Sequence, residues 1–213
     1  MFRDRTDAGE RLAETLRERG VTADVVLAVP RGGLPVGRVV ADALGRPLDV
    51  VVARKLGAPG NPELAIGAVG ADGATWLNDD LLDRLGVGEG YVERERERQT
   101  AVAREKREAY QPEPVDLAGK SVLIVDDGIA TGATTIACVR AVEAAGARRV
   151  VVAVPVAPPE SVALLRQVAD DVVCVETPFV FGAVARFYDS FPQVSDDEAR
   201  AYLDRGRVDP AAP

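Results

Sequence analysis

The fold of this chain is governed by five short and almost wholly apolar runs, which are separated by helical segments. The runs cover residues 25–29, 48–53, 121–125, 150–154 and 171–175. A strand that is buried on both faces should be nearly all apolar, and strands that alternate with helices are typical of a parallel sheet covered on both sides. We therefore predict an α/β protein with an open, mainly parallel sheet flanked by helices.

The helical segments and turns are delimited by glycine, proline and capping residues. Amphipathic spacing predicts a helix over residues 7–19, and caps, helix breakers and charge patterning predict further helices over residues 36–44, 78–85, 91–109 and 133–145. Ser161 is predicted to cap a further helix that ends at Val168, and residues 65–69 and 75–77 are predicted to pair as a hairpin. By contrast, RKLGAPGNPE at residues 54–63 is predicted to be a loop, because glycine and proline disfavour helix and sheet pairing.

Composition excludes several functional classes. The chain has 213 residues, a net charge of −8, no histidine, and two cysteines, Cys138 and Cys174, in apolar stretches. The acidic balance argues against a nucleic-acid partner, and the lack of histidine excludes Ser-His-Asp and Cys-His hydrolases. The cysteines are predicted to be buried structural thiols. Because every apolar run is far shorter than the roughly 20 residues that span a bilayer, and the N-terminus is charged, we expect a cytoplasmic protein without a membrane partner.

One motif, Val122–Thr134, carries most of the chemical information; it reads VLIVDDGIATGAT. An apolar strand delivers Asp126 and Asp127 to the carboxyl edge of the sheet, where open parallel sheets bind ligands. A turn with glycine and threonine then leads into a helix. The backbone N–H groups and dipole at that helix N-terminus favour a phosphate, and Thr131 and Thr134 add hydroxyl donors.

Two carboxylates beside a phosphate site need an explanation, since like charges repel. Asp126 and Asp127 fit there if they accept hydrogen bonds from sugar hydroxyls or hold the water shell of a magnesium ion. A phosphorylated ribose satisfies both parts of the site. The alternative is an ordinary strand-to-helix turn whose aspartates cap the helix. A Walker A loop is excluded, because no Gly-Lys-Ser/Thr follows the glycines.

The string at residues 122–134 resembles the signature with which type I phosphoribosyltransferases bind 5-phosphoribosyl 1-pyrophosphate (PRPP): a hydrophobic run, Asp-Asp, and a G-x-A-T-G-x-T loop. The resemblance implies the fold of that family, with a small hood lobe over the acceptor site. It implies that Asp126 and Asp127 act in catalysis and contact Mg²⁺ indirectly, through ligand hydroxyls and water. The residues that it implies for the 5′-phosphate are Gly128, Ala130, Thr131, Gly132, Ala133 and Thr134.

The family places a pyrophosphate-binding loop after its first sheet strand, and Pro30-Arg31-Gly32-Gly33 stands there in this chain. The resemblance implies that Arg31, Gly32 and Gly33 bind pyrophosphate, with a cis peptide at Arg31–Gly32. It implies that Arg54 and Lys55 also bind pyrophosphate, and that Lys55 acts in catalysis. Lysine is rare here: of 26 basic residues, only Lys55, Lys106 and Lys120 are lysine. The alternative for each basic residue is a solvent-facing position at a strand end.

A mobile lid is implied for Gly57–Glu63, which would close over the reacting centre and exclude water. The strings RKLGAPGNPELAIGAV and FVFGAVARFYDSFPQV narrow the resemblance to a bacterial branch of predicted phosphoribosyltransferases whose acceptor is unassigned. The segment after Glu176 breaks the strand–helix alternation and holds four of the five phenylalanines. We predict a core over residues 1–176 and a C-terminal hood segment with a tail over residues 177–213, in the same compact domain.

Three aromatic residues of the hood, Phe181, Phe187 and Tyr188, are candidates to stack on an acceptor, and their alternative role is packing within the hood. No hood sequence matches purine, orotate or uracil recognition, so the acceptor stays open. The prediction is a magnesium-dependent phosphoribosyltransferase that displaces pyrophosphate from C1 of PRPP with a nitrogenous small molecule. Its alternatives are a PRPP-sensing regulator without catalysis and an enzyme that acts on another ribose phosphate. A homo-oligomer is compatible with the sequence.

Overall fold

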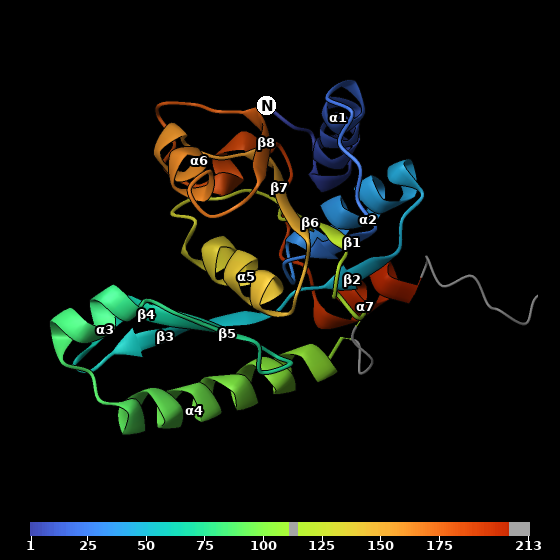
Figure 1. The fold of residues 1–213 in the computed structure, drawn as a ribbon. Coiled ribbons are helices and arrows are strands. Elements are labelled where there is room, and N and C mark those ends of the chain that lie inside the picture. Colours follow the sequence, from blue (N-terminus) through green and yellow to red (C-terminus); the bar gives the residue numbers. More distant parts are fainter. Residues whose placement is uncertain (111–114, 205–213) are drawn as a thin grey trace, which may run out of the picture.

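A computed structural model of the protein describes residues 1–110 and 115–204, without the side chain of Glu63. The main sheet has five parallel strands in the order β2-β1-β6-β7-β8 (Figure 1). Its strands are β1 (Val25–Ala28), β2 (Leu48–Val50), β6 (Ser121–Val125), β7 (Arg149–Val156) and β8 (Asp171–Glu176). The prediction of an α/β fold with an open, parallel sheet is confirmed.

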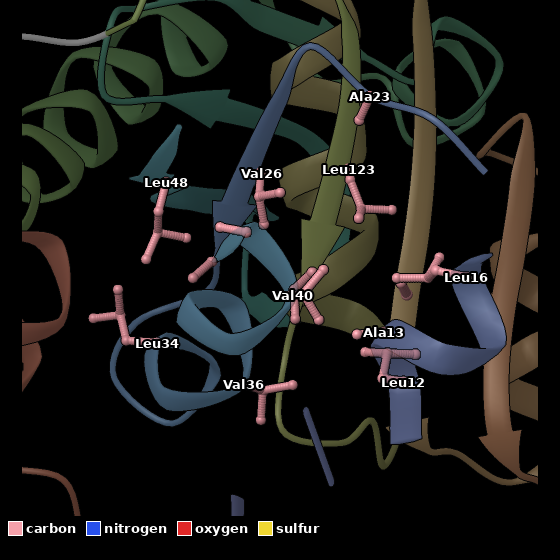
Figure 2. Close-up of a cluster of buried hydrophobic side chains, with 14 of the residues drawn as sticks. Leu12, Ala13, Leu16, Ala23, Val26, Leu34, Val36, Val40, Leu48 and Leu123 are labelled. Carbon is pink, nitrogen blue, oxygen red and sulfur yellow. The ribbon is translucent and has the colours of Figure 1, made fainter. Parts of the chain in front are cut away.

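Helices cover both faces of the main sheet, each over its own apolar layer. The helices on one face are α1 (Arg5–Glu18), α2 (Gly33–Leu44) and α7 (Asp196–Asp204), and those on the other are α5 (Ala133–Ala144) and α6 (Pro159–Leu165). Successive residues of β6 point to opposite layers: Leu123 lies in the first (Figure 2) and Ile124 in the second. Because both layers are apolar, the strands contain almost no polar residues.

A second, antiparallel sheet follows β2 in the chain and projects from the core (Figure 1). It consists of β3 (Ala53–Ala58), β4 (Asn61–Gly70) and β5 (Thr75–Leu77), and it is followed by α3 (Asp79–Leu85) and α4 (Glu89–Glu108). We call residues 53–108 the flap. The flap sheet lies between α5 on one side and α4 on the other. It has a small core of its own, which is formed by Leu56, Ala58, Ile66 and Val69.

The loop predicted over residues 54–63 is a β-hairpin for most of its length, so that prediction is wrong. β3 pairs with β4 from Ala53–Gly70 to Ala58–Asn61, and the register is irregular on both sides of Gly57. Leu56 is fully buried and anchors the hairpin in the flap core. A methyl group built on Gly57 would lie 2.7 Å from Cα of Pro62, so glycine here permits close strand contact. The lid role of Gly57–Glu63 stays a prediction, and the side chain of Glu63 lies outside the described residues.

The predicted helices agree with the structure to within three residues, except near Ser161. Asn78 caps α3, because its Oδ1 accepts from the N–H of Leu81 at 3.1 Å. α6 instead begins at Pro159, in the first helical position where proline costs no hydrogen bond, and it ends before the predicted Val168. The hairpin predicted from residues 65–69 and 75–77 is confirmed as β4 and β5. Among the described residues, no helix is both long and apolar enough to cross a membrane.

The segment after β8 forms a lobe that is tied to the N-terminus of the chain. The N–H of Phe2 donates to the carbonyl of Phe187 at 2.8 Å, and the N–H of Asp189 donates to the carbonyl of Phe2 at 2.9 Å. The fully buried Phe2 ring lies 5.3 Å from the ring of Tyr188. The predicted hood thus closes on N-terminal residues. The tail at residues 205–213 lies outside the described residues.

The two cysteines differ in burial. Cys138 on α5 is buried, as predicted, and burial raises the pKa of its thiol to about 12. Cys174 on β8 is only partly buried, and burial raises the pKa of its thiol as well. Both thiols therefore stay protonated at neutral pH, which is the expected state of structural cysteines.

Candidate functional site

The loop between β6 and α5 is anchored at its base and open to solvent at its tip. The N–H of Ile129 donates to the carbonyl of Val156 at 2.9 Å, and Oγ of Ser161 donates to the carbonyl of Ala130 at 2.6 Å. α5 begins after Gly132, whose φ of +79° is left-handed and which has no capping side chain. The first N–H groups of α5 therefore have no capping partner and favour an anion.

The six residues predicted for the 5′-phosphate are all brought together in this loop. Its exposed members are Ala130, Thr131, Ala133 and Thr134, whereas Gly128 and Gly132 lie deeper. A methyl group built on Gly128 would lie 2.6 Å from Cγ1 of Val184, so glycine lets the hood approach the start of the loop. Thr131 and Thr134 are thus exposed at the tip of the loop, and their binding of a phosphate stays a prediction.

The loop at Pro30–Gly33 lies directly against the acidic pair. A methyl group built on Gly32 would lie 2.2 Å from Oδ2 of Asp127, and one on Gly33 would lie 2.8 Å from the carbonyl of Val125. Only a residue without Cβ fits at either position. The structure thus brings the predicted pyrophosphate loop against the predicted ribose-binding carboxylates. Its cis peptide is at Pro30–Arg31, so the position predicted from the sequence is wrong by one residue.

The two carboxylates of the pair have different partners. Oδ2 of Asp127 accepts from Nε of Arg5 at 2.8 Å, and both side chains are largely buried. Oδ1 of Asp126 accepts from the N–H of Asp127 at 2.9 Å. Burial raises the pKa of Asp126 well above its ordinary value, and the charge of Asp127 adds to the rise. Burial also raises the pKa of Asp127, against the opposite effect of Arg5. Perturbed carboxylates in such a position are typical of functional sites.

Arg5 is a site residue that the sequence reasoning missed. Its guanidinium also donates to the carbonyl of Pro192 at 2.7 Å, and it lies 3.7 Å from the ring centroid of Phe191. Arg5 is 122 positions from Asp127, so no local motif links the two. The available signal is that Arg5 shares the apolar stripe of α1 with Leu12 and Leu16, since a buried arginine requires a partner.

Arg54 and Lys55 do not lie together. They are neighbours on β3, so their side chains point to opposite faces of the flap sheet. Nε of Arg54 donates to Oε1 of Gln99 on α4 at 3.2 Å. Lys55 is therefore on the face that α5 covers, and it is half-buried. Arg31 is half-exposed, and its Nη1 lies 3.6 Å from Oδ1 of Asp196 at the start of α7.

The three aromatic residues predicted to contact an acceptor lie in one hydrophobic cluster of the hood. Tyr188 is buried, and its hydroxyl donates to the carbonyl of Asp127. Phe181 and Phe187 are partly buried, with ring centroids 5.1 Å apart. The packing role is therefore the better description of Tyr188. Phe179 was not singled out from the sequence, yet 92% of it is exposed to solvent.

Comparison with known proteins shows the family of this chain. The family model described as "Phosphoribosyl transferase domain" matches residues 3–190. A Mycobacterium tuberculosis H37Rv protein, with the provisional name phosphoribosyl transferase, is 44% identical over 211 residues, which are 98% of this chain and 48% of the relative. The crystal structure of TT1426 from Thermus thermophilus is 47% identical, has a TM-score of 0.87, and matches 95% of this chain and 97% of that chain.

The chain spans about half the length of the curated relatives it matches over its full extent. A shorter match, 44% identical over 71 residues, is to a ribose-phosphate pyrophosphokinase of Sulfurisphaera tokodaii, and it covers 33% of this chain and 23% of that protein. The family model covers most of the chain and includes both the loop at Pro30–Gly33 and the motif at Val122–Thr134. The chain therefore belongs to the phosphoribosyl transferase domain family.

Proposed function

We propose that the protein is a phosphoribosyltransferase that uses PRPP and magnesium to attach a phosphoribosyl group to a nitrogenous small molecule. The observation that carries the proposal is the contact of two glycines, Gly32 and Gly33, with the segment Val125–Asp127. This contact joins the loop that carries Arg31 to the partly buried Asp126 and the buried Asp127, and the anchored loop that follows exposes Thr131 and Thr134. Arg31 would lie on one side of the carboxylates, and Thr131 and Thr134 on the other. This arrangement suits PRPP, whose ribose carries pyrophosphate at C1 and phosphate at C5.

The proposed reaction requires positioning rather than an activated side-chain nucleophile. The nitrogen lone pair of the acceptor forms a bond to C1 of the ribose, the bond from C1 to the pyrophosphate oxygen breaks, and the nitrogen loses a proton to solvent. Asp126 and Asp127 would orient the ribose hydroxyls, and Arg31 and Lys55 would bind the departing pyrophosphate. Holding the reactants in place and neutralising developing charge supply the rate enhancement, so the absence of histidine is no obstacle.

The residues present fit a magnesium ion that binds together with the ligand. Among the described residues, no group of three or more histidine, cysteine, aspartate or glutamate side chains could hold a metal. Mg²⁺ usually keeps several waters and binds substrate phosphates, so PRPP would supply phosphate oxygens while Asp126 and Asp127 would hold the ion indirectly, through ligand hydroxyls and water. When bound, Mg²⁺ would neutralise charge on the pyrophosphate.

Pyrophosphate release from PRPP tests the proposal. We expect the purified chain to consume PRPP in the presence of Mg²⁺ and one class of acceptor, in a screen of nucleobases, amines and ammonia. Calorimetry should show tighter PRPP binding with Mg²⁺ than without it, because two carboxylates face a polyanion. PRPP that is bound but never consumed would indicate a sensor, and turnover of another ribose phosphate alone would indicate a different enzyme. No PRPP binding with or without Mg²⁺ would overturn the proposal.

Phe179 is the residue that we expect to contact the acceptor. It follows the carboxyl end of β8 by three residues and is the most exposed aromatic residue of the described hood. Stacking of a base on an aromatic ring contributes about 1–3 kcal/mol, so Phe179→Ala should raise the KM for an aromatic acceptor by about 5- to 150-fold. The KM for PRPP should not change. The matched control is Val180→Ala, and an equal effect of both variants would contradict stacking.

A further inference from the structure

One stripe of α4 is buried against the flap sheet. Glu95, Gln99 and Ala103 are the buried residues of this helix, and their spacing of four residues defines the stripe. Three residues after Ala103 the same side of the helix carries Lys106, and four residues later it leads to Tyr110, just after the helix ends. The inward stripe therefore runs from the flap sheet, through Lys106, to the end of the helix.

The end of this stripe lies at the predicted pyrophosphate loop. The hydroxyl of Tyr110 donates to Oδ1 of Asp196 at 2.9 Å, and the same oxygen lies 3.6 Å from Nη1 of Arg31. Arg107, which follows Lys106, donates to Oδ2 of Asp49 at 2.7 Å and to the carbonyl of Val50 at the carboxyl end of β2. The residues around Lys106 are thus fixed against the core near the site.

Lys106 itself is exposed, although it belongs to the inward stripe. The ion pairs recorded within the described residues of α4 involve Arg96, Arg98 and Arg107, and none of them involves Lys106. Lys106 lies four residues before Tyr110 on the same side of the chain, and so it stands near the group formed by Tyr110, Asp196 and Arg31. A hydrated cation beside the predicted pyrophosphate loop, without a carboxylate of its own, is suited to a mobile polyanion.

We propose that Lys106 binds the pyrophosphate group of PRPP, as a cation additional to Arg31 and Lys55. The inference rests on the proposed function. Lys106 would reach the ligand from the flap, whereas Arg31 belongs to the loop after β1. The ligand would therefore connect the flap to the core through its pyrophosphate end, and its ribose 5-phosphate end would contact the core alone.

Charge removal at two lysines tests this assignment. Lys106→Gln is compared with Lys120→Gln, because Lys120 precedes β6 at the opposite, amino edge of the same sheet. The probes are inorganic pyrophosphate with Mg²⁺ and ribose 5-phosphate, and calorimetry measures binding of each. We expect Lys106→Gln to weaken pyrophosphate binding by about 10- to 150-fold, the range for a lost hydrogen bond to a charged group. Ribose 5-phosphate binding should be unchanged, and Lys120→Gln should change neither.

The remaining outcomes are distinguishable. Lys106→Arg should retain most of the pyrophosphate affinity, since it keeps the charge. Equal pyrophosphate binding by Lys106→Gln and Lys120→Gln would overturn the inference. A loss of both probes together with a lower Tm would indicate a structural role and would also overturn it. A wild-type protein that binds neither probe would overturn the proposed function, and this inference with it.

Discussion

Replacement of Asp126 by asparagine should raise the thermal stability of the protein and remove most of its turnover. Burial raises the folded-state pKa of Asp126 above its unfolded value, so the folded state disfavours the charged form. Stability is therefore lost as the pH rises from the ordinary aspartate pKa of about 3.9 through the raised value. At neutral pH the asparagine variant avoids that loss. Turnover should fall by about 10- to 150-fold, because a charged acceptor for a ribose hydroxyl is lost.

The measurement is Tm at about pH 5 and about pH 8, together with the rate of pyrophosphate release. The gain in Tm of the asparagine variant over the wild type should be larger at the higher pH. Asp127→Asn is the contrasting variant, because it leaves the buried guanidinium of Arg5 without its carboxylate. That change should cost about 3–5 kcal/mol of stability, the range for breaking a buried ion pair. A destabilised Asp126→Asn variant at pH 8 would show that Asp126 is a capping residue of the fold.

Replacement of Gly32 by alanine should abolish most PRPP turnover while the fold persists. The added methyl group would lie 2.2 Å from Oδ2 and 2.8 Å from Cγ of Asp127, so either the loop or the Arg5–Asp127 pair has to move. Overpacking of this kind costs about 1–3 kcal/mol of stability. A displacement of about 1 Å at a reacting centre costs on the order of 100-fold in rate, so turnover should fall by about that factor.

Gly88→Ala is the matched control for Gly32→Ala. Gly88 has a φ of −72°, and nothing lies within 4 Å of a methyl group built on it. We expect this control to keep wild-type turnover and PRPP affinity. The two variants are compared in pyrophosphate release and in calorimetric titration with PRPP and Mg²⁺. Wild-type turnover by Gly32→Ala would mean that the close contact between the two loops is not needed for the reaction.

The main sheet could be predicted from the sequence because a strand that is buried on both faces consists almost wholly of apolar residues. Val122–Val125 is wholly apolar, and the structure buries each of its residues between two helical layers. The flap hairpin could not be predicted in the same way. Gly57 and Pro62 are turn residues by local preference, but here they permit close strand pairing around the buried Leu56. Packing within the flap overrides the local preference.

In the candidate site, residues that are contiguous in the chain could be predicted from the sequence, whereas residues brought in from distant elements could not. The loop from Gly128 to Thr134 is contiguous in the chain, so its residues could be named from the motif. Arg5 reaches Asp127 from the first helix, and Lys106 belongs to a helix whose inward stripe is defined only by packing against the flap. Arg54 and Lys55 are adjacent in the sequence, yet strand alternation directs them to opposite faces of the flap sheet.

The position of α5 between the main sheet and the flap sheet has a consequence for how such a protein can diversify. The space on the flap side is so narrow that a methyl group built on Gly70 would lie 3.3 Å from Cβ of Ala141. Larger residues on this helix would force the two sheets apart, so selection should restrict it to small side chains. Phe179 and Val180 face solvent and carry no such restriction. If the proposed function holds, we expect acceptor preference to change by substitutions in the hood, while packing restricts substitutions on α5.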